Sequence, residues 1–437
     1  MRFLLAVCAL GPALRASVAT AQQSPTSDSA RQAPADTLRI TRAQAVSDAL
    51  ERNPQLVVAR EQTAEARAQR VQTLGIPDPT GTAALQPQHG QPTTKPVMVG
   101  IDIPFPDKFR LQYGIGTAGV RQAQAMETGL TQQIASQTAQ TYDSLLVALR
   151  HEGDLTESRR LSADFLAKTQ ARYAAGTAAK LDVIQAEVAV AQGDAALLSN
   201  ASDITRARTS LNRLVGRPLG LPIAPADSLT VPPALPELPA LETHALSARP
   251  ELTGLDAQRR GAHASTTLAE EFWLPDVTAS STWDLGAPDP YFPTSAPLFS
   301  IGVSLPIPIF FWQHLKGEIA QARHHERELS ASYRDTYAAV DQDVRSAYAT
   351  ARTALEQVAF LRDHLLPSAR DAYRVASVSY GLGGSSAIEV LQARQTMVAA
   401  ESQYTDALAA ANAAQADLER ATAAPLAQFP PGAPDVH

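Results

Sequence analysis

Residues 172–187 read RYAAGTAAKLDVIQAE, and residues 379–394 read SYGLGGSSAIEVLQAR. The two stretches align without a gap at a constant offset of 207 residues. The aligned pairs that carry the likeness are Tyr173/Tyr380, Gly176/Gly383, Leu181/Ile388, Asp182/Glu389, Val183/Val390, Ile184/Leu391, Gln185/Gln392 and Ala186/Ala393. A chain that repeats itself builds one structural unit twice, so this pair of segments governs how the rest of the sequence is interpreted.

Two further pairs of segments follow the same rule. VGIDIPFP at 99–106 matches IGVSLPIP at 301–308, and NPQL at 53–56 matches RPEL at 249–252. The offset changes only slightly along the chain, so both halves contain the same parts in the same order. Duplication followed by a few insertions is the simplest explanation.

Composition limits the class of protein. A chain of 437 residues usually holds two or three domains, although one duplicated architecture fits equally well. The net charge is −7 and no long block of Lys or Arg occurs, so we expect no nucleic-acid partner. Aromatic residues make up only 5% of the chain, which favours thin cores between closely packed helices.

The first 21 residues have the pattern of a secretory signal peptide. Arg2 supplies the positive charge, residues 3–14 are mostly apolar, and residues 19–21 form an Ala-Thr-Ala cleavage site. The only cysteine, Cys8, lies inside this segment. We therefore expect an exported mature chain with no disulfide, no cysteine metal site and no cysteine nucleophile.

The remaining chain divides into five segments. We predict a tether over 22–40, a first repeat over 41–215, a Pro-rich linker over 216–242, a second repeat over 243–424 and a disordered tail over 425–437.

Each repeat contains two stretches in which apolar and polar residues alternate, as in a half-buried strand. The predicted strands are 80–87 and 97–104 in the first repeat and 277–285 and 298–306 in the second.

The rest of each repeat is helical. A first helix is expected over 41–74 with a kink at Pro54, and its counterpart over 243–272. Long helices follow over 108–173 and 312–380, the second with a break at Pro367, and each spans roughly 100 Å. After each turn comes a helix of about half that length, over 178–214 and 385–423. Each repeat therefore reads as one long helix beside two short helices placed end to end.

The long helix of the second repeat carries a heptad-like seam that predicts coiled-coil packing. Its members are Val344, Tyr348, Ala351, Leu355, Val358 and Leu365.

The strands point to a membrane. Four strands cannot close a barrel wide enough for a channel, and their apolar faces have no second sheet to cover them. Lipid is one natural partner for such faces, and three chains would pool twelve strands of suitable length. No later segment holds 18 consecutive apolar residues, so no transmembrane helix is expected. The other interpretation is a periplasmic coiled coil that carries two hairpins.

With these paired segments in this order behind a signal peptide, residues 38–424 resemble the TolC-like outer-membrane efflux proteins. The resemblance implies a mainly α fold with a small β part, in which three chains form a twelve-stranded outer-membrane β-barrel that continues into a periplasmic α-helical barrel. It also implies passive export, a homotrimer, contact with outer-membrane lipid, a periplasmic adaptor (membrane fusion) protein and an inner-membrane pump of the RND type. GIPDP at 75–79 and DKFR at 107–110 are most similar to the CzcC-like branch, which makes heavy-metal cations the first candidate cargo. Export of drugs, other solutes or proteins stays open.

The resemblance also implies that the two turns lie at the periplasmic tip, where they close the channel and dock the adaptor. Asp182 and Glu389 would then form rings of three carboxylates at the gate, with Gln185 and Gln392 one turn later. Acidic residues also stabilise the first turn of any helix, and that alternative stays open for both. The residues expected at the adaptor-docking tips are Gly176, Thr177, Gly383 and Gly384. Tyr173 and Tyr380 are expected to pack inside their hairpins.

No catalytic, cofactor or metal site is expected. His324 and His325 are adjacent, so on a helix their side chains diverge and a solvated surface is the simpler explanation. The function predicted is the outer-membrane channel of a tripartite efflux system. A soluble periplasmic coiled-coil adaptor or scaffold is the alternative.

Overall fold

The computed structural model describes residues 38–74, 78–85, 95–284, 298–304 and 312–430. The chain divides into two units after Asp36, and all of the described residues belong to the second, Thr37–His437. The predicted signal peptide and most of the predicted tether lie outside the described residues. The ends of the strands predicted to reach residues 87, 285 and 306 also lie outside them.

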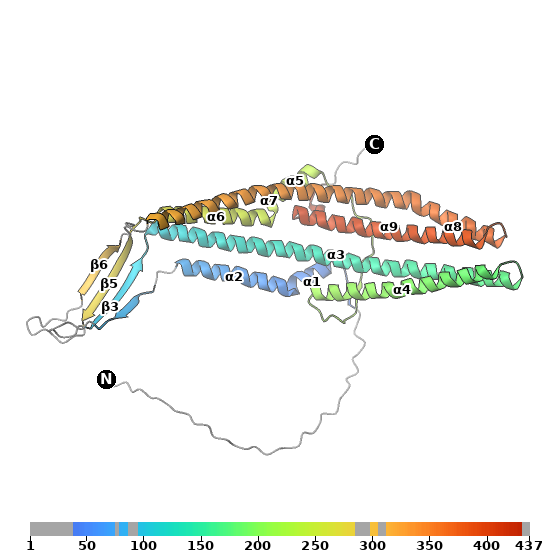
Figure 1. Cartoon of the computed structure of the whole chain (residues 1–437), viewed down its shortest axis with the longest axis horizontal. Helices are drawn as coiled ribbons and strands as arrows, with labels where there is room; N and C mark the ends of the chain where they lie inside the picture. The colour runs from blue at the N-terminus through green and yellow to red at the C-terminus, as the bar shows by residue number, and fades with distance from the viewer. Residues whose placement is uncertain (1–37, 75–77, 86–94, 285–297, 305–311, 431–437) are drawn as a thin grey trace, which may run out of the picture. The chain divides into compact units, whose positions relative to one another are not determined.

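In the described residues of the first repeat, one long helix lies beside three shorter ones (Figure 1). They are α1 (Arg42–Arg52), α2 (Pro54–Leu74), α3 (Pro106–Ala174) and α4 (Lys180–Leu214). α3 has 69 residues, which corresponds to about 104 Å. α1, α2 and α4 all pack on α3. The predicted arrangement of a long helix beside shorter ones is confirmed.

The second repeat follows the same plan. Its helices are α5 (Leu238–Ala248), α6 (Pro250–Glu270), α7 (Trp312–Phe360), α8 (Leu366–Gly381) and α9 (Ala387–Thr422). A single wide π-helical turn, Leu361–Leu365, joins α7 to α8 just before Pro367. A proline cannot donate the helical hydrogen bond and its ring crowds the preceding turn, so the wider turn accommodates it.

An X-Pro pair divides the first helical segment of each repeat. α1 ends before Asn53 and α2 begins at Pro54, whereas α5 ends before Arg249 and α6 begins at Pro250. Proline suits the first helical position because its missing N–H has no partner there. The single helix predicted over 243–272 is therefore wrong in two respects: it is split at Arg249, and its first part begins earlier.

The strands of the two repeats join one antiparallel sheet in the order β2-β3-β5-β6. The strands are β2 (Thr80–Ala83), β3 (Pro96–Ile103), β5 (Asp276–Asp284) and β6 (Leu298–Ser304). β3 of the first repeat pairs with β5 of the second along its whole length. The two predicted hairpins are thus fused into one surface.

One face of this sheet is apolar. Ile103 pairs with Val277, which pairs with Val303, and Val97 pairs with Trp283. Ile103, Val277, Trp283 and Val303 are each more than a third exposed in the single chain. The apolar face therefore has no cover from the described part of the chain.

The predicted tether and linker each contain a short strand, and the two strands form a second sheet. β1 (Leu38–Ile40) pairs in parallel with β4 (Ile223–Pro225). Ile40 and Ile223 are buried in a cluster with Tyr142 of α3. Short apolar strands thus anchor both connecting segments, although their surroundings are rich in proline and polar residues.

The predicted disordered tail is also wrong for its first residues. Leu426–Gln428 form a 3-10 turn, and the Leu426 side chain is buried against the second-repeat core. The Leu426 N–H donates to Glu419 Oε1 of α9 at 3.2 Å. Residues 431–437 lie outside the described residues.

The second-repeat core follows the predicted seam. Val344, Ala351 and Val358 of α7 are buried at 2% exposure or less and belong to one cluster with Leu408 and Leu418 of α9. This seam fixes α7 against the returning helix.

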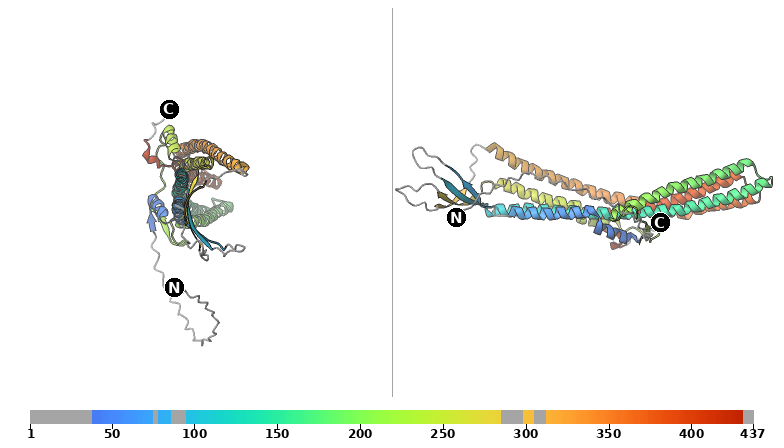
Figure 2. Two further views of the ribbon diagram at one scale, coloured as in Figure 1. Left: turned by 90° about the vertical axis from the view of Figure 1, so that its left-hand side faces the viewer. Right: turned by 90° about the horizontal axis from the view of Figure 1, so that it is seen from below.

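Small residues bring α3 and α6 together where the two repeats meet (Figures 1 and 2). A Cβ added to Gly261 would lie 2.9 Å from the Ala118 Cβ, and one added to Gly254 would lie 3.2 Å from the Ala125 Cβ. A methyl group at Gly261 would therefore force a shift, and one at Gly254 would be tightly packed. The glycines therefore set the spacing between the repeats.

This spacing leads to a stability prediction. Gly261→Ala should lower the free energy of unfolding by about 1–3 kcal/mol, because the new methyl group overpacks the contact with Ala118. Denaturant unfolding of the detergent-solubilised protein measures the change. Gly119→Ala is the matched control, since nothing lies within 4 Å of its added Cβ, and it should be neutral or stabilising by up to about 1 kcal/mol. Equal effects of the two substitutions would contradict close packing at Gly261.

Candidate functional site

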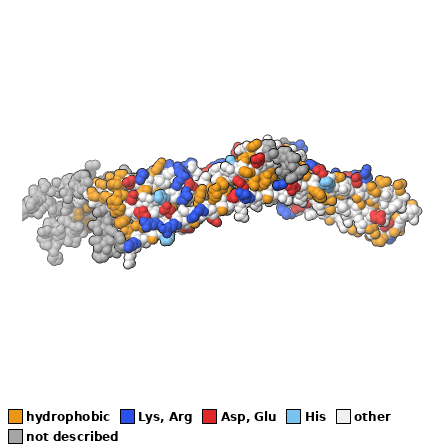
Figure 3. All heavy atoms as spheres, turned by 90° about the horizontal axis from the view of Figure 1, so that it is seen from above, with side chains coloured by type: hydrophobic (Ala, Val, Ile, Leu, Met, Phe, Trp, Pro, Cys, Tyr) orange, Lys and Arg blue, Asp and Glu red, His pale blue; other side chains and the backbone are white. Residues whose placement is uncertain are grey.

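The two repeated turns lie at the end of the helices opposite the four-stranded sheet (Figure 1). On the face shown in Figure 3, charged side chains are few at this end, whereas Lys and Arg gather over the helices next to the sheet. The sequence prediction for the gate and the docking tips concerns these turns.

The first turn closes through a left-handed glycine. Gly176 has φ +73°, and its N–H donates to the Tyr173 carbonyl at 2.9 Å. The N–H and the hydroxyl of Thr177 both donate to the Arg172 carbonyl, at 2.9 and 3.1 Å. These contacts satisfy carbonyl groups at the end of α3, as a left-handed C-cap does.

The second turn repeats this geometry with a different glycine pair. Gly383 has φ +84°, and its N–H donates to the Tyr380 carbonyl at 3.1 Å. The Gly384 N–H donates to the Ser379 carbonyl at 2.8 Å, but Gly384 is not left-handed. Only Gly383 is therefore required by the backbone conformation.

Both predicted gate acids cap the helix that follows their turn. The Glu389 carboxylate accepts the Ser386 N–H at 3.2 Å, while the Ser386 hydroxyl accepts the Glu389 N–H at 3.3 Å. The Asp182 carboxylate accepts the Ala179 N–H at 3.3 Å. The capping alternative is thus realised for each acid, and it leaves the side chains partly or fully exposed. A capping role and a role in the channel are compatible.

The two predicted glutamines differ in their surroundings. Gln392 is exposed. Gln185 is half-buried, and its Oε1 atom is buried without a hydrogen-bond donor among the residues that the structure describes.

Contact between the two hairpins centres on Arg172 and Tyr380. The Arg172 guanidinium donates to the Tyr380 carbonyl at 2.6 Å and lies 4.3 Å from the centre of the Tyr380 ring. The Tyr380 ring packs on Phe165 of α3, and its hydroxyl lies 3.4 Å from Thr169 Oγ1. These contacts join the end of α8 to the last turns of α3.

The two tyrosines behave differently. Tyr380 is 4% exposed, as predicted, but Tyr173 is 47% exposed, so the prediction that it packs inside its hairpin is wrong. The repeat is asymmetric here because Arg172 aligns with Ser379, which has no side chain long enough to reach across. Sequence reasoning missed Arg172, although this mismatch was a visible signal.

A second contact between the hairpins involves a buried arginine. Arg394 of α9 is 7% exposed and donates to the hydroxyls of Ser158 and Ser162 on α3. Burial lowers the pKa of its guanidinium. This contact holds the beginning of α9 against α3.

Asn53 and Arg249 each hold the end of a returning helix in the middle of the helical body, and we call these two sets of contacts the joints. The Asn53 side chain donates to the Leu214 carbonyl at 3.1 Å and accepts the Gln55 N–H at 2.9 Å. The Arg249 guanidinium donates to the carbonyls of Arg420 and Ala421, at 3.2 and 3.3 Å. In both repeats, the residue before the proline thus caps the end of the returning helix, α4 or α9.

Within the described part of the chain, no group of three or more His, Cys, Asp or Glu side chains could hold a metal ion. His324 and His325 are exposed, and His325 Nδ1 lies 3.4 Å from Glu328 Oε2. None of the helices in the described ranges is long and apolar enough to cross a membrane.

The chain is a duplicated, mainly α protein in which two long helical hairpins extend from one short antiparallel sheet. Residues 241–424 match the family model described as "Outer membrane efflux protein". OpmQ, the pyoverdine export outer membrane protein of Pseudomonas aeruginosa, is 27% identical over 278 residues, which cover 61% of this chain and 56% of OpmQ. CzcC, the cobalt-zinc-cadmium resistance protein of Cupriavidus metallidurans, is 22% identical over 350 residues, which cover 80% of this chain and 82% of CzcC.

The solved structure of the outer-membrane channel OprN has the same fold. Its TM-score is 0.77 at 19% identity, over 87% of this chain and 89% of OprN. Residues 241–424 thus match the sequence pattern of outer membrane efflux proteins, and the chain has the fold of the OprN channel. The family model describes outer membrane proteins and OprN is an outer-membrane channel, and the outer membrane is the location predicted for this chain. The match to OpmQ spans little more than half of that protein.

The joints provide a testable prediction. Asn53→Ala should lower the free energy of unfolding by about 1–3 kcal/mol, because it leaves a buried carbonyl at the end of α4 without a donor. Thr205→Ala, on an exposed part of α4, removes a side-chain hydrogen bond to the Ala201 carbonyl and should change stability by less than about 0.5 kcal/mol. Thermal unfolding of both variants measures the difference. A joint that contributes nothing would give Asn53→Ala the same melting curve as the control.

Proposed function

We propose that this chain is the outer-membrane channel of a tripartite efflux system. In this proposal it passively exports a substrate that a periplasmic adaptor protein and an inner-membrane pump of the RND type deliver. The observation that carries the proposal is the combination of an uncovered apolar sheet face at one end and two closed helical turns at the other. A soluble adaptor or scaffold, the alternative function, would have no use for that apolar face.

The sheet supports a trimeric channel. Four strands are too few to enclose a pore, but three copies would supply twelve. Ile103, Val277 and Val303 would then face lipid, and the lipid chains would cover these apolar side chains. Fractionation tests this step, because recovery in the soluble periplasm without detergent would rule out the channel.

The turns would form the periplasmic gate and the docking surface. Asp182 and Glu389, with Gln185 and Gln392 one turn later, are the residues we propose for the constriction. Gly176, Thr177, Gly383 and Gly384 are the residues we propose for adaptor docking. Exposure of the caps supports this assignment, since an adaptor can reach them without unfolding the turns.

The charge of Glu389 can be separated from its capping role. Glu389→Gln removes the charge but keeps an oxygen that can accept the Ser386 N–H, as Gln44 does for Thr41 in the equivalent cap of α1 at 2.9 Å. Glu389→Ala removes both. If three carboxylates control passage, both variants should raise cation conductance to a similar extent in planar bilayers.

Glu401→Gln, on the same helix but paired with Arg370, is the matched control and should leave conductance unchanged. An effect of Glu389→Ala without any effect of Glu389→Gln would show that the residue only caps α9.

Arg172 should hold the gate closed. Arg172→Ala removes the hydrogen bond to the Tyr380 carbonyl and the contact with its ring, so the hairpins should separate more readily and the channel should open more often. Single-channel recording measures the open fraction. Arg206→Ala removes an exposed arginine that pairs only within α4, and it should behave as wild type. Equal open fractions in all three proteins would remove Arg172 from the gate.

For the cargo, we propose heavy-metal cations. The alignment with CzcC, named for resistance to cobalt, zinc and cadmium, spans most of both chains and supports this choice. Deletion of the gene should therefore lower tolerance to these metals, and the unmodified gene should restore it. OpmQ is named for pyoverdine export. Unchanged metal tolerance combined with loss of pyoverdine export would favour that cargo instead.

A further inference from the structure

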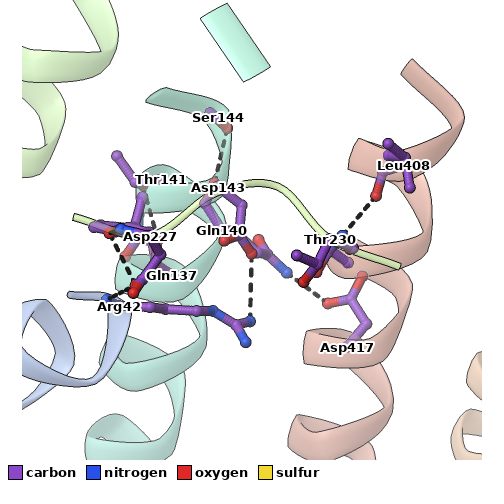
Figure 4. A network of polar contacts seen from close by, with 12 residues as sticks. Arg42, Gln137, Gln140, Thr141, Asp143, Ser144, Asp227, Thr230, Leu408 and Asp417 are labelled. Atoms are coloured by element: carbon purple, nitrogen blue, oxygen red, sulfur yellow. Dashed lines mark hydrogen bonds and ion pairs between the residues drawn. The ribbon is translucent and has the colours of Figure 1, made fainter. Parts of the chain in front are cut away.

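A polar cluster in the middle of α3 holds both connecting segments of the chain (Figure 4). We call Arg42, Tyr142, Asp143 and Asp227 the clasp. The backbone N–H of Arg42 donates to Asp227 Oδ2 at 2.7 Å. The Tyr142 hydroxyl lies 2.9 Å from the Ile40 carbonyl oxygen and 3.0 Å from Asp227 Oδ2. β1 and the segment after β4 are therefore attached to α3 through these side chains.

Asp143 is the least satisfied member of the clasp. It is 5% exposed, and its Oδ2 atom lies 3.3 Å from Arg42 Nη2. This ion pair is not aligned as a hydrogen bond, and no donor among the described residues hydrogen-bonds to Oδ2. A buried carboxylate with a single loosely placed cation is costly to keep charged.

The surroundings of Asp143 contain more negative than positive charge. Arg42 of α1 faces it with a favourable interaction, whereas Asp227 and Glu419 of α9 face it with unfavourable ones. Asp143 also lines a cavity of about 520 Å³ on its other side. The charged or titratable side chains that line this cavity or lie next to it are His151, Asp203, Asp417 and Arg420. The Arg42 guanidinium pairs with Asp143, whereas Asp227 accepts from the Arg42 backbone N–H and the Tyr142 hydroxyl.

We propose that Asp143 is a proton-binding switch: uptake of a proton by its carboxyl group tightens the attachment of β1 and the segment after β4 to α3. The neutral carboxyl group no longer repels Asp227 and Glu419, and burying it costs less free energy than burying the charged carboxylate. Arg42 and Tyr142 keep their contacts with the connecting segments in either state, so the clasp tightens without rearranging.

The direction of the pH effect follows from the titration. Burial, as the largest cause, raises the pKa of Asp143 from 3.8 to about 6, and Arg42 opposes this rise. The folded clasp therefore binds a proton more tightly than the open chain does. Stability is lowest above pH 6 and increases as the pH falls from 6 towards 4. A simple salt bridge would have the opposite dependence.

Hydrogen exchange of the full-length protein in detergent tests the proposal. The probe is the Ala226 N–H, which donates to the Ile40 carbonyl at 2.8 Å and is released when the clasp opens. After correction for intrinsic exchange, its protection factor should rise about tenfold from pH 7.5 to pH 5.0 in the wild type. In Asp143→Asn, which mimics the neutral group, protection should be high at pH 7.5 and independent of pH.

Two further variants complete the test. Asp371→Asn removes an exposed carboxylate that pairs with Arg374, and it should retain the wild-type pH dependence. Arg42→Gln should move the midpoint of the protection change to higher pH, a shift that a merely structural role would not produce. This midpoint decides the question if Asp143→Asn does not fold. Wild-type protection that falls or stays constant on acidification would overturn the proposal, as would a midpoint unchanged in Arg42→Gln.

Discussion

The ends of α4 and α9 lie in the middle of the helical body, where their last carbonyl groups are shielded from water and need protein donors. Asn53 supplies the donor for α4, and Arg249 supplies it for α9. The rest of the structure depends on this constraint. One long helix can lie beside two shorter ones only if the helix ends that meet halfway are capped. The proline after each capping residue starts the next helix at that same point, so a single dipeptide performs both tasks.

Duplication supplied the two joints and the two turns, and later divergence made them unequal. Asn53 caps α4 with one neutral amide, whereas Arg249 caps α9 with a guanidinium that also pairs with Glu251 and Asp343. At the turns, Arg172 reaches across to Tyr380, but its counterpart Ser379 cannot reach back. The first hairpin therefore supplies the side chain that restrains the second. This asymmetry is consistent with two turns that have different tasks.

Much of the fold could be predicted because the signals for it lie between residues that are close together in the sequence. Helix periodicity, the X-Pro breaks and the glycine turns each depend on residues within a few positions of one another. The strands β1 and β4 could not be predicted, since each has only three residues and its partner lies about 185 positions away. The contacts of Arg172 and the burial of Asp143 depend in the same way on helices that meet only after folding. Capping by Asp182 and Glu389 was foreseen as an alternative, because an acid in a first helical turn has that effect in any context.

A channel of this kind requires three copies to complete the barrel that one chain leaves open, with the sheet in lipid and the turns closed at the other end. Electron cryomicroscopy of the purified protein in lipid nanodiscs tests this requirement most directly. We expect three copies around one axis, a closed twelve-stranded barrel inside the lipid and helical turns that narrow the far end of the channel. Single copies, or an assembly whose four-stranded sheets lie outside the lipid, would contradict it.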